Sequence, residues 1–317
     1  MISKFKAWIL AARPQTLTGA IAPIFIAVSF IATSVERSLL NGHCYSFCSV
    51  AILCFLFALI MQIDANFIND YYDFKNGKDS ENRVGPRRAC AQGWISPKEM
   101  KIGIIITSIL ACCVGLPLIR VGGFSMILVG LICVAAAFMY SQFIASWGKG
   151  DIFVVLFFGL VPVFFTSFLL YRTLYDSSYF SSPYFFPSII LGFAMGLVTD
   201  TLLLVNNYRD YSEDSVSGKR TLIVRYGRGW GIWGYFICGV FSIILLLFIP
   251  YLNMAVESHN FLTIRRLLFL LPYLNTHIIL TNLLHKWRDN PQLLNKHLKY
   301  TGLNIFFFAI LFSLSCL

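Results

Sequence analysis

Long apolar stretches recur along the whole chain, separated by short segments rich in charged and polar residues. Each stretch holds about 17 to 24 mostly apolar residues, enough for an α-helix to cross a hydrocarbon core about 30 Å thick. The apolar residues run continuously instead of alternating, so the stretches lack the pattern of outer-membrane strands. We place predicted spans near residues 17–34, 46–69, 102–119, 123–142, 152–171, 186–208, 231–252, 265–284 and 301–317.

These nine stretches predict an all-α, polytopic membrane protein, because inside lipid only helices and closed barrels satisfy every backbone group. The composition agrees: 57% of the residues are hydrophobic and 13% are charged, whereas soluble domains are roughly half apolar and a quarter charged. No linker or low-complexity tract divides the chain. We therefore expect residues 1–317 to form one helical domain embedded in a lipid bilayer.

The basic residues are distributed unevenly between the predicted loops. A formal net charge of +10 could suggest nucleic acid as a partner, but the distribution favours a membrane interpretation. Of the 25 Lys and Arg residues, twenty lie before the first span or after even-numbered spans, and five lie on the other face. The positive-inside rule then puts the N-terminus and the even-to-odd loops in the cytoplasm. We expect no nucleic-acid partner.

The second and sixth predicted spans end in similar polar sequences, and each continues into a basic segment. If the helices persist through these ends, the polar residues of each motif share one helical face, because they recur every three or four residues. The two faces consist of Asn66, Asn69, Asp70 and Asp73, and of Asn206, Asp210 and Asp214.

Carboxylates gathered on one face repel each other by about 4 kcal/mol for a pair 4 Å apart at an effective dielectric constant of 20. A cation between them relieves that repulsion, and Mg²⁺ suits oxygen ligands combined with a substrate's phosphates. The basic residues after each motif can bind phosphate oxygens. Together the patterns predict a membrane enzyme that acts on a lipid diphosphate.

Two other interpretations explain part of the pattern. Charged loops at helix ends are commonly solvated caps and topology anchors, and one Asp-rich motif would not exclude that. A transporter would also have many spans and buried acids, but transporters usually place binding residues at mid-membrane on broken helices. Here the polar groups gather at one predicted rim and the motif occurs twice, which favours the enzyme.

An ordered set of short sequences carries a family resemblance over nearly the whole chain. These sequences resemble the UbiA superfamily of intramembrane aromatic prenyltransferases and, within it, the members of menaquinone biosynthesis. The matching stretches are residues 12–17, 22–23, 69–73, 83–88, 157–159, 206–210 and 218–222.

The resemblance implies a helical bundle around a central cavity, with the two Asp motifs facing each other across its cytoplasmic mouth. It also implies Mg²⁺ dependence and location in a bacterial cytoplasmic (inner) membrane. The reaction it implies is transfer of a polyprenyl group from a polyprenyl diphosphate to the aromatic acid 1,4-dihydroxy-2-naphthoate, with loss of the carboxylate and of diphosphate. Alternative acceptors are 4-hydroxybenzoate, homogentisate and haem, and a lipid glycerol phosphate is a more distant one.

Individual roles follow from the resemblance. It implies that Asp70, Asp73, Asp210 and Asp214 hold Mg²⁺ on the diphosphate, with amide side chains beside them and basic groups that neutralise the leaving group. The broad family pattern has a third Asp in the first motif where this chain has Gly77, and the next acid is Asp79. The amides are Asn66, Asn69, Asn206 and Asn207, and the basic residues are Arg87, Arg88, Arg209, Lys219 and Arg220.

Two acids fall inside predicted spans, where an ionisable residue is a functional candidate. At 100° per residue, Asp200 lies near the polar face of its helix and Asp64 lies opposite. We therefore expect Asp200 to line the deeper cavity and to bind substrate, and Asp64 to hydrogen-bond a neighbouring helix. Tyr140 and Asp151 are expected to border the mouth. Apolar walls for an isoprenoid tail are expected from Phe157, Phe158, Phe164 and Phe165.

Overall fold

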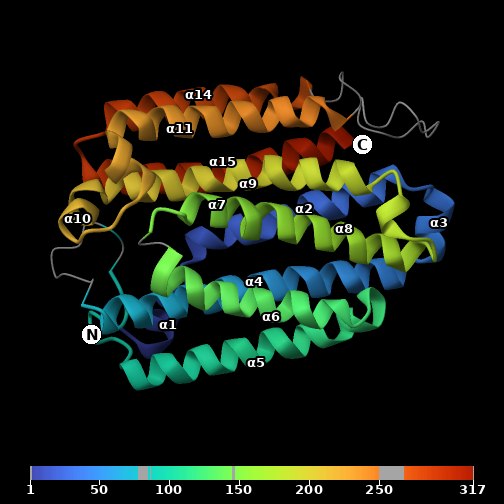
Figure 1. Cartoon of the computed structure of the whole chain (residues 1–317), viewed down its shortest axis with the longest axis horizontal. Helices are drawn as coiled ribbons and strands as arrows, with labels where there is room; N and C mark the ends of the chain where they lie inside the picture. The colour runs from blue at the N-terminus through green and yellow to red at the C-terminus, as the bar shows by residue number, and fades with distance from the viewer. Residues whose placement is uncertain (1, 78–84, 86, 145–146, 250–267, 317) are drawn as a thin grey trace.

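The computed structural model describes residues 2–77, 85, 87–144, 147–249 and 268–316. Its long helices lie side by side, roughly along one direction, and form an all-helical bundle (Figure 1). The helices are α1 (Lys4–Ala12), α2 (Leu17–Ser34), α3 (Arg37–Gly42), α4 (Cys44–Lys75), α5 (Pro97–Gly122), α6 (Ser125–Met139), α7 (Gly150–Val155), α8 (Val161–Leu174), α9 (Phe185–Arg209), α10 (Tyr211–Val216), α11 (Leu222–Leu247), α14 (Leu271–Lys286) and α15 (Pro291–Cys316).

Short 3₁₀ and π segments connect or interrupt these helices. The 3₁₀ turns η1 (Pro14–Thr16), η4 (Tyr179–Ser181) and η5 (Leu268–Leu270) precede α2, α9 and α14. The π segment η2 (Tyr140–Ile144) follows α6, and η3 (Leu156–Leu160) joins α7 to α8. π-Bulges are frequent at functional sites, and residues of both π segments line the cavities described below.

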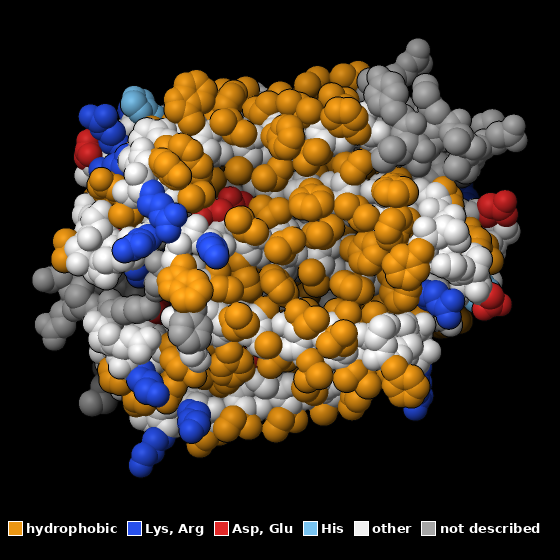
Figure 2. Space-filling view, in the orientation of Figure 1, with side chains coloured by type: hydrophobic (Ala, Val, Ile, Leu, Met, Phe, Trp, Pro, Cys, Tyr) orange, Lys and Arg blue, Asp and Glu red, His pale blue; other side chains and the backbone are white. Residues whose placement is uncertain are grey.

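Within the described residues, eight helical stretches are long and apolar enough to cross a membrane. They correspond to the predicted spans except the eighth, which overlaps the 16-residue helix α14. Residues 250–252, 265–267 and 317 of three predicted spans lie outside the described part. The apolar side chains form a broad band around the middle of the visible face, while Lys and Arg gather mostly at one end (Figure 2).

Helix α4 is longer than the predicted span. Its 32 residues make a helix about 48 Å long at 1.5 Å per residue, whereas the hydrocarbon core is only about 30 Å thick. The C-terminal turns of α4, which carry the first motif, therefore extend toward the basic end of the bundle. This confirms that the helix persists through Asp73, as the spacing of the motif required.

Helix α9 lies in the middle of the bundle and is the most buried of the eight candidate spans. Of the residues in its most apolar 18-residue stretch, 67% are buried inside the protein. Its neighbours include α11, η3, α8 and α15. Glycines permit the closest approach: a Cβ on Gly159 of η3 would lie 2.3 Å from Cα of Gly196, and one on Gly196 would lie 2.5 Å from the Val155 carbonyl oxygen. This packing fixes the helix that carries the second motif.

Candidate functional site

Two cavities meet at the end of the bundle where α4 and α9 finish. One is polar, with a volume of about 180 Å³, and the other is a larger, mostly apolar cavity of about 530 Å³. Thr16, Asn69, Tyr140, Leu202, Leu203 and Asn206 line both. The shared residues show that the polar cavity lies beside the apolar one.

The first motif supplies one wall of the polar cavity through Asn69 and Asp73. An oxygen of Asp73 lies 2.5 Å from Nη2 of Arg88, which also lines the cavity. Asn66 lines the apolar cavity, and its amide donates to the Ala12 carbonyl and to the Thr16 hydroxyl. Asn66 therefore fixes the segment between α1 and α2 against α4.

Asp70 has a position that differs from the expectation. It is buried, and it is not among the residues that line the polar cavity. Its two oxygens accept the backbone N–H groups of Ala89 and Cys90, at 2.8 and 2.9 Å. The carboxylate thus holds the segment that follows Arg88 instead of facing the cavity.

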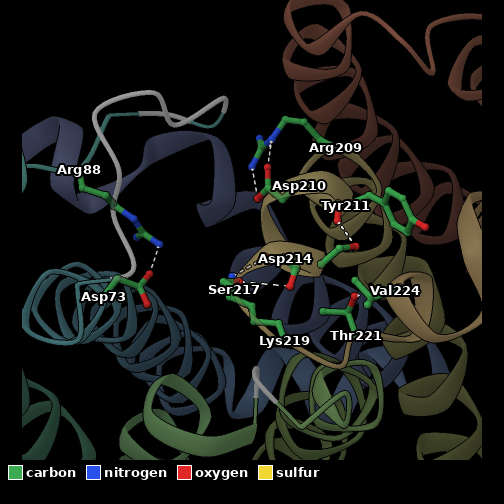
Figure 3. A network of polar contacts seen from close by, with 11 residues as sticks. Asp73, Arg88, Arg209, Asp210, Tyr211, Asp214, Ser217, Lys219, Thr221 and Val224 are labelled. Atoms are coloured by element: carbon green, nitrogen blue, oxygen red, sulfur yellow. Dashed lines mark hydrogen bonds and ion pairs between the residues drawn. The ribbon is translucent and has the colours of Figure 1, made fainter.

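The second motif forms the opposite wall. Asn206, Asn207, Asp210 and Asp214 line the polar cavity. Arg209 makes a two-pronged pair with Asp210, at 2.7 and 2.8 Å, and also donates to Asn295 of α15. Asp214 accepts from Nζ of Lys219 at 2.6 Å. Figure 3 shows these two pairs on one side of the opening and the Arg88–Asp73 pair on the other.

The local sequence explains how Lys219 reaches Asp214. Gly218 has φ +74°, a left-handed conformation that glycine adopts without strain, and the chain then turns back so that the Lys219 N–H donates to the Asp214 carbonyl. Thr221 ends the turn as the N-cap of α11, accepting from the Val224 N–H. Burial raises the pKa of the Asp214 carboxyl above its ordinary value, and the Lys219 ammonium partly offsets this rise.

Three predicted binding residues do not line either cavity. Arg87 and Arg220 are exposed, and they are absent from both cavity walls. Asp200 is buried but also lines neither cavity, so the prediction that it lines the deeper one is wrong. A rotation of 100° per residue gives the direction of Asp200 around the axis of α9, but not which helix packs on that side. Helix α11 packs against α9, and Cys238 of α11 lies within electrostatic reach of Asp200.

Other predicted positions agree with the structure. Tyr140 and Asp151 line the polar cavity, while Phe157, Phe158 and Phe165 line the apolar one. Phe164 instead packs against Tyr179 and Phe185. Asp64 accepts hydrogen bonds from Thr107 and Ser108 of α5, which confirms its expected role between helices. Asp79 lies outside the described residues.

Residues between α1 and α2 also belong to the polar cavity, and the motif patterns gave no reason to assign them there. Arg13, Gln15 and Thr16 line it. Arg13 has φ 51°, unusual for a residue with a side chain, and its N–H caps α1 by donating to the Leu10 carbonyl. A signal was present in the sequence, because Arg13 lies in the first stretch that carries the family resemblance.

The donor chemistry of the polar cavity suits a hard divalent cation. Carboxylates of Asp73, Asp210 and Asp214 and amide oxygens of Asn69, Asn206 and Asn207 are the oxygen ligands that Mg²⁺ prefers. In the described residues, no three acids, cysteines or histidines are clustered closely enough to hold a metal. Each of the three carboxylates instead contacts a basic side chain.

Fold and site together define a helical membrane protein with a polar cavity beside a larger apolar one. The family model for the UbiA prenyltransferase family matches residues 20–282. The chain belongs to this family.

Relatives with described activities share a large part of the chain. It is 34% identical over 233 residues to the 1,4-dihydroxy-2-naphthoate octaprenyltransferase of Haemophilus influenzae, covering 71% of this chain and 70% of the relative. It is also 34% identical over 236 residues to the Escherichia coli enzyme of the same description, with coverages of 71% and 70%. A UbiA homolog from Archaeoglobus fulgidus, solved with GPP and Mg²⁺, has the same fold: TM-score 0.62, 15% identity, and 97% and 99% of the two chains covered.

Proposed function

We propose that the chain transfers a polyprenyl group from a polyprenyl diphosphate to 1,4-dihydroxy-2-naphthoate, with loss of the carboxylate as CO₂ and release of diphosphate. The observation that carries this proposal is the junction of the polar and apolar cavities. A polyprenyl diphosphate has the same two parts, and its reactive carbon, which bears the diphosphate, belongs at their boundary. Asn69, Tyr140 and Asn206 line that boundary.

The basic residues of the polar cavity bind the diphosphate. Arg88, Arg209 and Lys219 now contact Asp73, Asp210 and Asp214. Guanidinium and ammonium groups make strong, charge-assisted bonds to phosphate oxygens, so an entering diphosphate competes for them. Their contacts with the departing diphosphate strengthen as negative charge develops on it during cleavage of the allylic carbon–oxygen bond.

Asp73, Asp210 and Asp214, with the amides of Asn69, Asn206 and Asn207, would hold Mg²⁺ in the proposed complex. The bound metal supplies positive charge that stabilises the leaving diphosphate. Asp70 serves this arrangement indirectly, since its hydrogen bonds to Ala89 and Cys90 hold the segment beside Arg88. The solved Archaeoglobus fulgidus homolog bound to GPP and Mg²⁺ supports a metal-dependent prenyl donor.

The relatives described as 1,4-dihydroxy-2-naphthoate octaprenyltransferases support the acceptor. An electron-rich naphthol ring at the cavity junction can attack the allylic carbon as its bond to diphosphate breaks. The apolar cavity holds the rest of the prenyl tail, between aromatic side chains that include Phe157, Phe158 and Phe165. The alternative acceptor is 4-hydroxybenzoate.

The basic end of the bundle lies at the polar cavity, and we infer that this end faces the cytoplasm. The positive-inside rule supports the orientation, and the substrates that carry negative charge would then enter from that side. The N-terminus and the motif loops lie together on that side, in a bacterial inner membrane.

Acceptor choice is tested with purified protein in liposomes, supplied with Mg²⁺, octaprenyl diphosphate and an equimolar mixture of dihydroxynaphthoate and hydroxybenzoate. Mass spectrometry of the lipid extract should show octaprenylated, decarboxylated naphthoquinol as the main product. Prenylated hydroxybenzoate in its place would keep the reaction type and overturn the acceptor. Absence of both products and of diphosphate release, together with counterflow of a soluble solute, would favour a transporter.

A further inference from the structure

Asp151 is a buried carboxyl group in the wall of the polar cavity, and it belongs to neither Asp motif. The residue is 8% exposed and begins α7 together with Gly150. Neither side-chain oxygen accepts a hydrogen bond from another described residue. A buried carboxylate without donors is costly. Asp151 therefore needs a hydrogen-bond donor that the other described residues do not provide.

A second buried acid, Asp200, lies near Asp151. Asp200 of α9 is 4% exposed, and its Oδ1 also accepts no hydrogen bond from the described residues. It lies within electrostatic reach of Asp151. Among the described residues, no ion pair joins a Lys or Arg to either acid. Asp200 thus supplies no countercharge to Asp151.

Asp64 shows that burial in a span does not by itself leave a carboxylate unsatisfied here. Its two oxygens accept from the hydroxyls of Thr107 and Ser108 on the neighbouring helix, and it lines neither cavity. Asp64 and Asp151 therefore differ in kind. Asp64 is hydrogen-bonded within the protein, while Asp151 adjoins a cavity and has no donor among the other described residues.

The location of Asp151 matches the place of the reaction. Tyr140, which lines both cavities, packs its ring on Phe153 with centroids 4.9 Å apart. Its hydroxyl lies 3.8 Å from the point where a Cβ added to Gly150 would lie. Asp151 lies between these two contacts in the chain; it lines the polar cavity, and Phe153 lines the apolar one. This first turn of α7 therefore borders the junction where the allylic carbon and the acceptor ring must meet.

We propose that Asp151 is a catalytic residue: its carboxylate accepts a hydrogen bond, and then the proton, from the acceptor hydroxyl that adjoins the carboxyl-bearing ring carbon. The ligand class for this position is an aromatic acid with a hydroxyl next to its carboxylate. This inference rests on the proposed function, because it assigns the acceptor's place within the same site.

The step balances without any further reagent. As Asp151 takes the hydroxyl proton, the O–H electron pair moves into the ring, the ring carbon forms a bond to the allylic carbon, and the carbon–oxygen bond to diphosphate breaks with its electrons on the diphosphate. The ring then carries a ketone next to a quaternary carbon that holds the carboxylate. Loss of CO₂ returns that electron pair to the ring and the ketone oxygen, which takes the proton back from Asp151.

The test compares wild-type protein, Asp151→Asn and Asp64→Asn in liposomes with Mg²⁺ and farnesyl diphosphate, using two acceptors. One acceptor is dihydroxynaphthoate, and the other is its methyl ether at the hydroxyl beside the carboxylate. The ether carries no proton to transfer, and its ring can attack and decarboxylate without a base. Release of diphosphate in the absence of acceptor is recorded as well, because it reports donor binding and ionisation alone.

With dihydroxynaphthoate, Asp151→Asn should lower kcat about a hundredfold or more, the size typical of lost general-base catalysis. The KM for farnesyl diphosphate, the Mg²⁺ requirement and the acceptor-free release of diphosphate should stay within a few-fold of wild type. With the ether, the two proteins should react at similar rates. Asp151→Glu should restore part of kcat, and Asp64→Asn should keep the wild-type ratio between the acceptors.

Equal losses in Asp151→Asn with both acceptors and in acceptor-free release would overturn the proposal in favour of a structural role. A raised Mg²⁺ requirement would overturn it in favour of a metal ligand. If neither protein turns over the ether, unimpaired acceptor-free release beside a lost transfer to dihydroxynaphthoate still supports it, and impaired release contradicts it. A wild-type protein that does not prenylate dihydroxynaphthoate at all would refute the proposed function itself.

Discussion

Nη2 of Arg88 lies 2.5 Å from Oδ2 of Asp73, and this pair forms one wall of the polar cavity. Both side chains are largely buried. One turn earlier on α4, Asp70 holds the backbone of the two residues that follow Arg88. The C-terminal end of α4 therefore positions a guanidinium where a diphosphate can exchange for a carboxylate partner.

Replacing Arg88 by Met removes that guanidinium while it keeps an unbranched apolar stem. We expect kcat/KM for the prenyl diphosphate to fall about ten- to a hundredfold, since a hydrogen bond to a charged group contributes about 1.5–3 kcal/mol. Steady-state kinetics over a range of donor concentrations measure it. Arg87→Met is the matched control, because Arg87 is exposed and outside both cavities, and an equal loss there would contradict the assignment.

Asp70→Asn and Asp73→Asn should fail in different ways. Asp73→Asn is expected to raise the Mg²⁺ concentration needed for half-maximal activity, because it removes a carboxylate from the cavity wall. Asp70→Asn replaces one of two acceptor oxygens for Ala89 and Cys90 by an amide that donates. It should lower the Tm and expose the segment near Arg88 to protease, with an unchanged Mg²⁺ requirement. A shared Mg²⁺ phenotype would place Asp70 among the metal ligands.

Much of the fold could be predicted from the sequence, because lipid imposes a simple rule: an apolar stretch of sufficient length must be a helix. The ends of helices were harder. Helix α4 continues through the polar residues up to Lys75, where apolarity no longer signals helix but the spacing of Asn66, Asn69 and Asp73 still does. Helix α15 begins at Pro291, ten residues before the predicted span. Apolarity did not indicate these first turns, because they are polar.

The site was predictable where one helix face carries it, and less so where the partner comes from elsewhere. The four-residue spacing of Asn206, Asp210 and Asp214 predicts that they lie together, and all three line the polar cavity. They do so although α9 ends at Arg209 and Asp214 lies on α10, so the helix does not persist through the second motif as the spacing assumed. Spacing could not show that Asp70 bonds to the backbone of Ala89, or that Asp200 lines neither cavity, because both depend on how separate segments pack. Arg13 enters the cavity through a turn between two helices, which no helical period describes.

The close contact of α9 with the end of α7 and with η3 should tolerate no added volume. Gly196→Val places side-chain atoms against the Val155 backbone, where even a Cβ would lie 2.5 Å from the carbonyl oxygen. We expect a loss of about 1–3 kcal/mol or more of stability, typical of overpacking. Thermal unfolding in detergent measures it. Gly229→Ala is the control, since a Cβ there has no neighbour within 4 Å; a Tm equal in both variants would contradict the packing.

The apolar cavity should set which donors fit. Gly130 lines it, and a Cβ at this position has no neighbour within 4 Å. Gly130→Phe therefore directs a ring into space that a long prenyl tail would occupy. We expect kcat/KM for octaprenyl diphosphate to fall at least about tenfold relative to that for geranyl diphosphate. The new ring keeps several methylenes of the long tail from being buried, and each buried methylene contributes about 0.8 kcal/mol to binding. An unchanged ratio would place the tail elsewhere.

The central claim is that the polar cavity holds the diphosphate of a prenyl donor while its tail lies in the apolar one. Its most direct test measures diphosphate and prenylated naphthoquinol together, from purified protein in liposomes with octaprenyl diphosphate and dihydroxynaphthoate. We predict equal amounts of both products with Mg²⁺, neither with EDTA, and loss of both in Asp210→Ala but not in Arg220→Ala, whose arginine is exposed and outside the cavities. Full product formation by Asp210→Ala, or with EDTA present, would contradict the account.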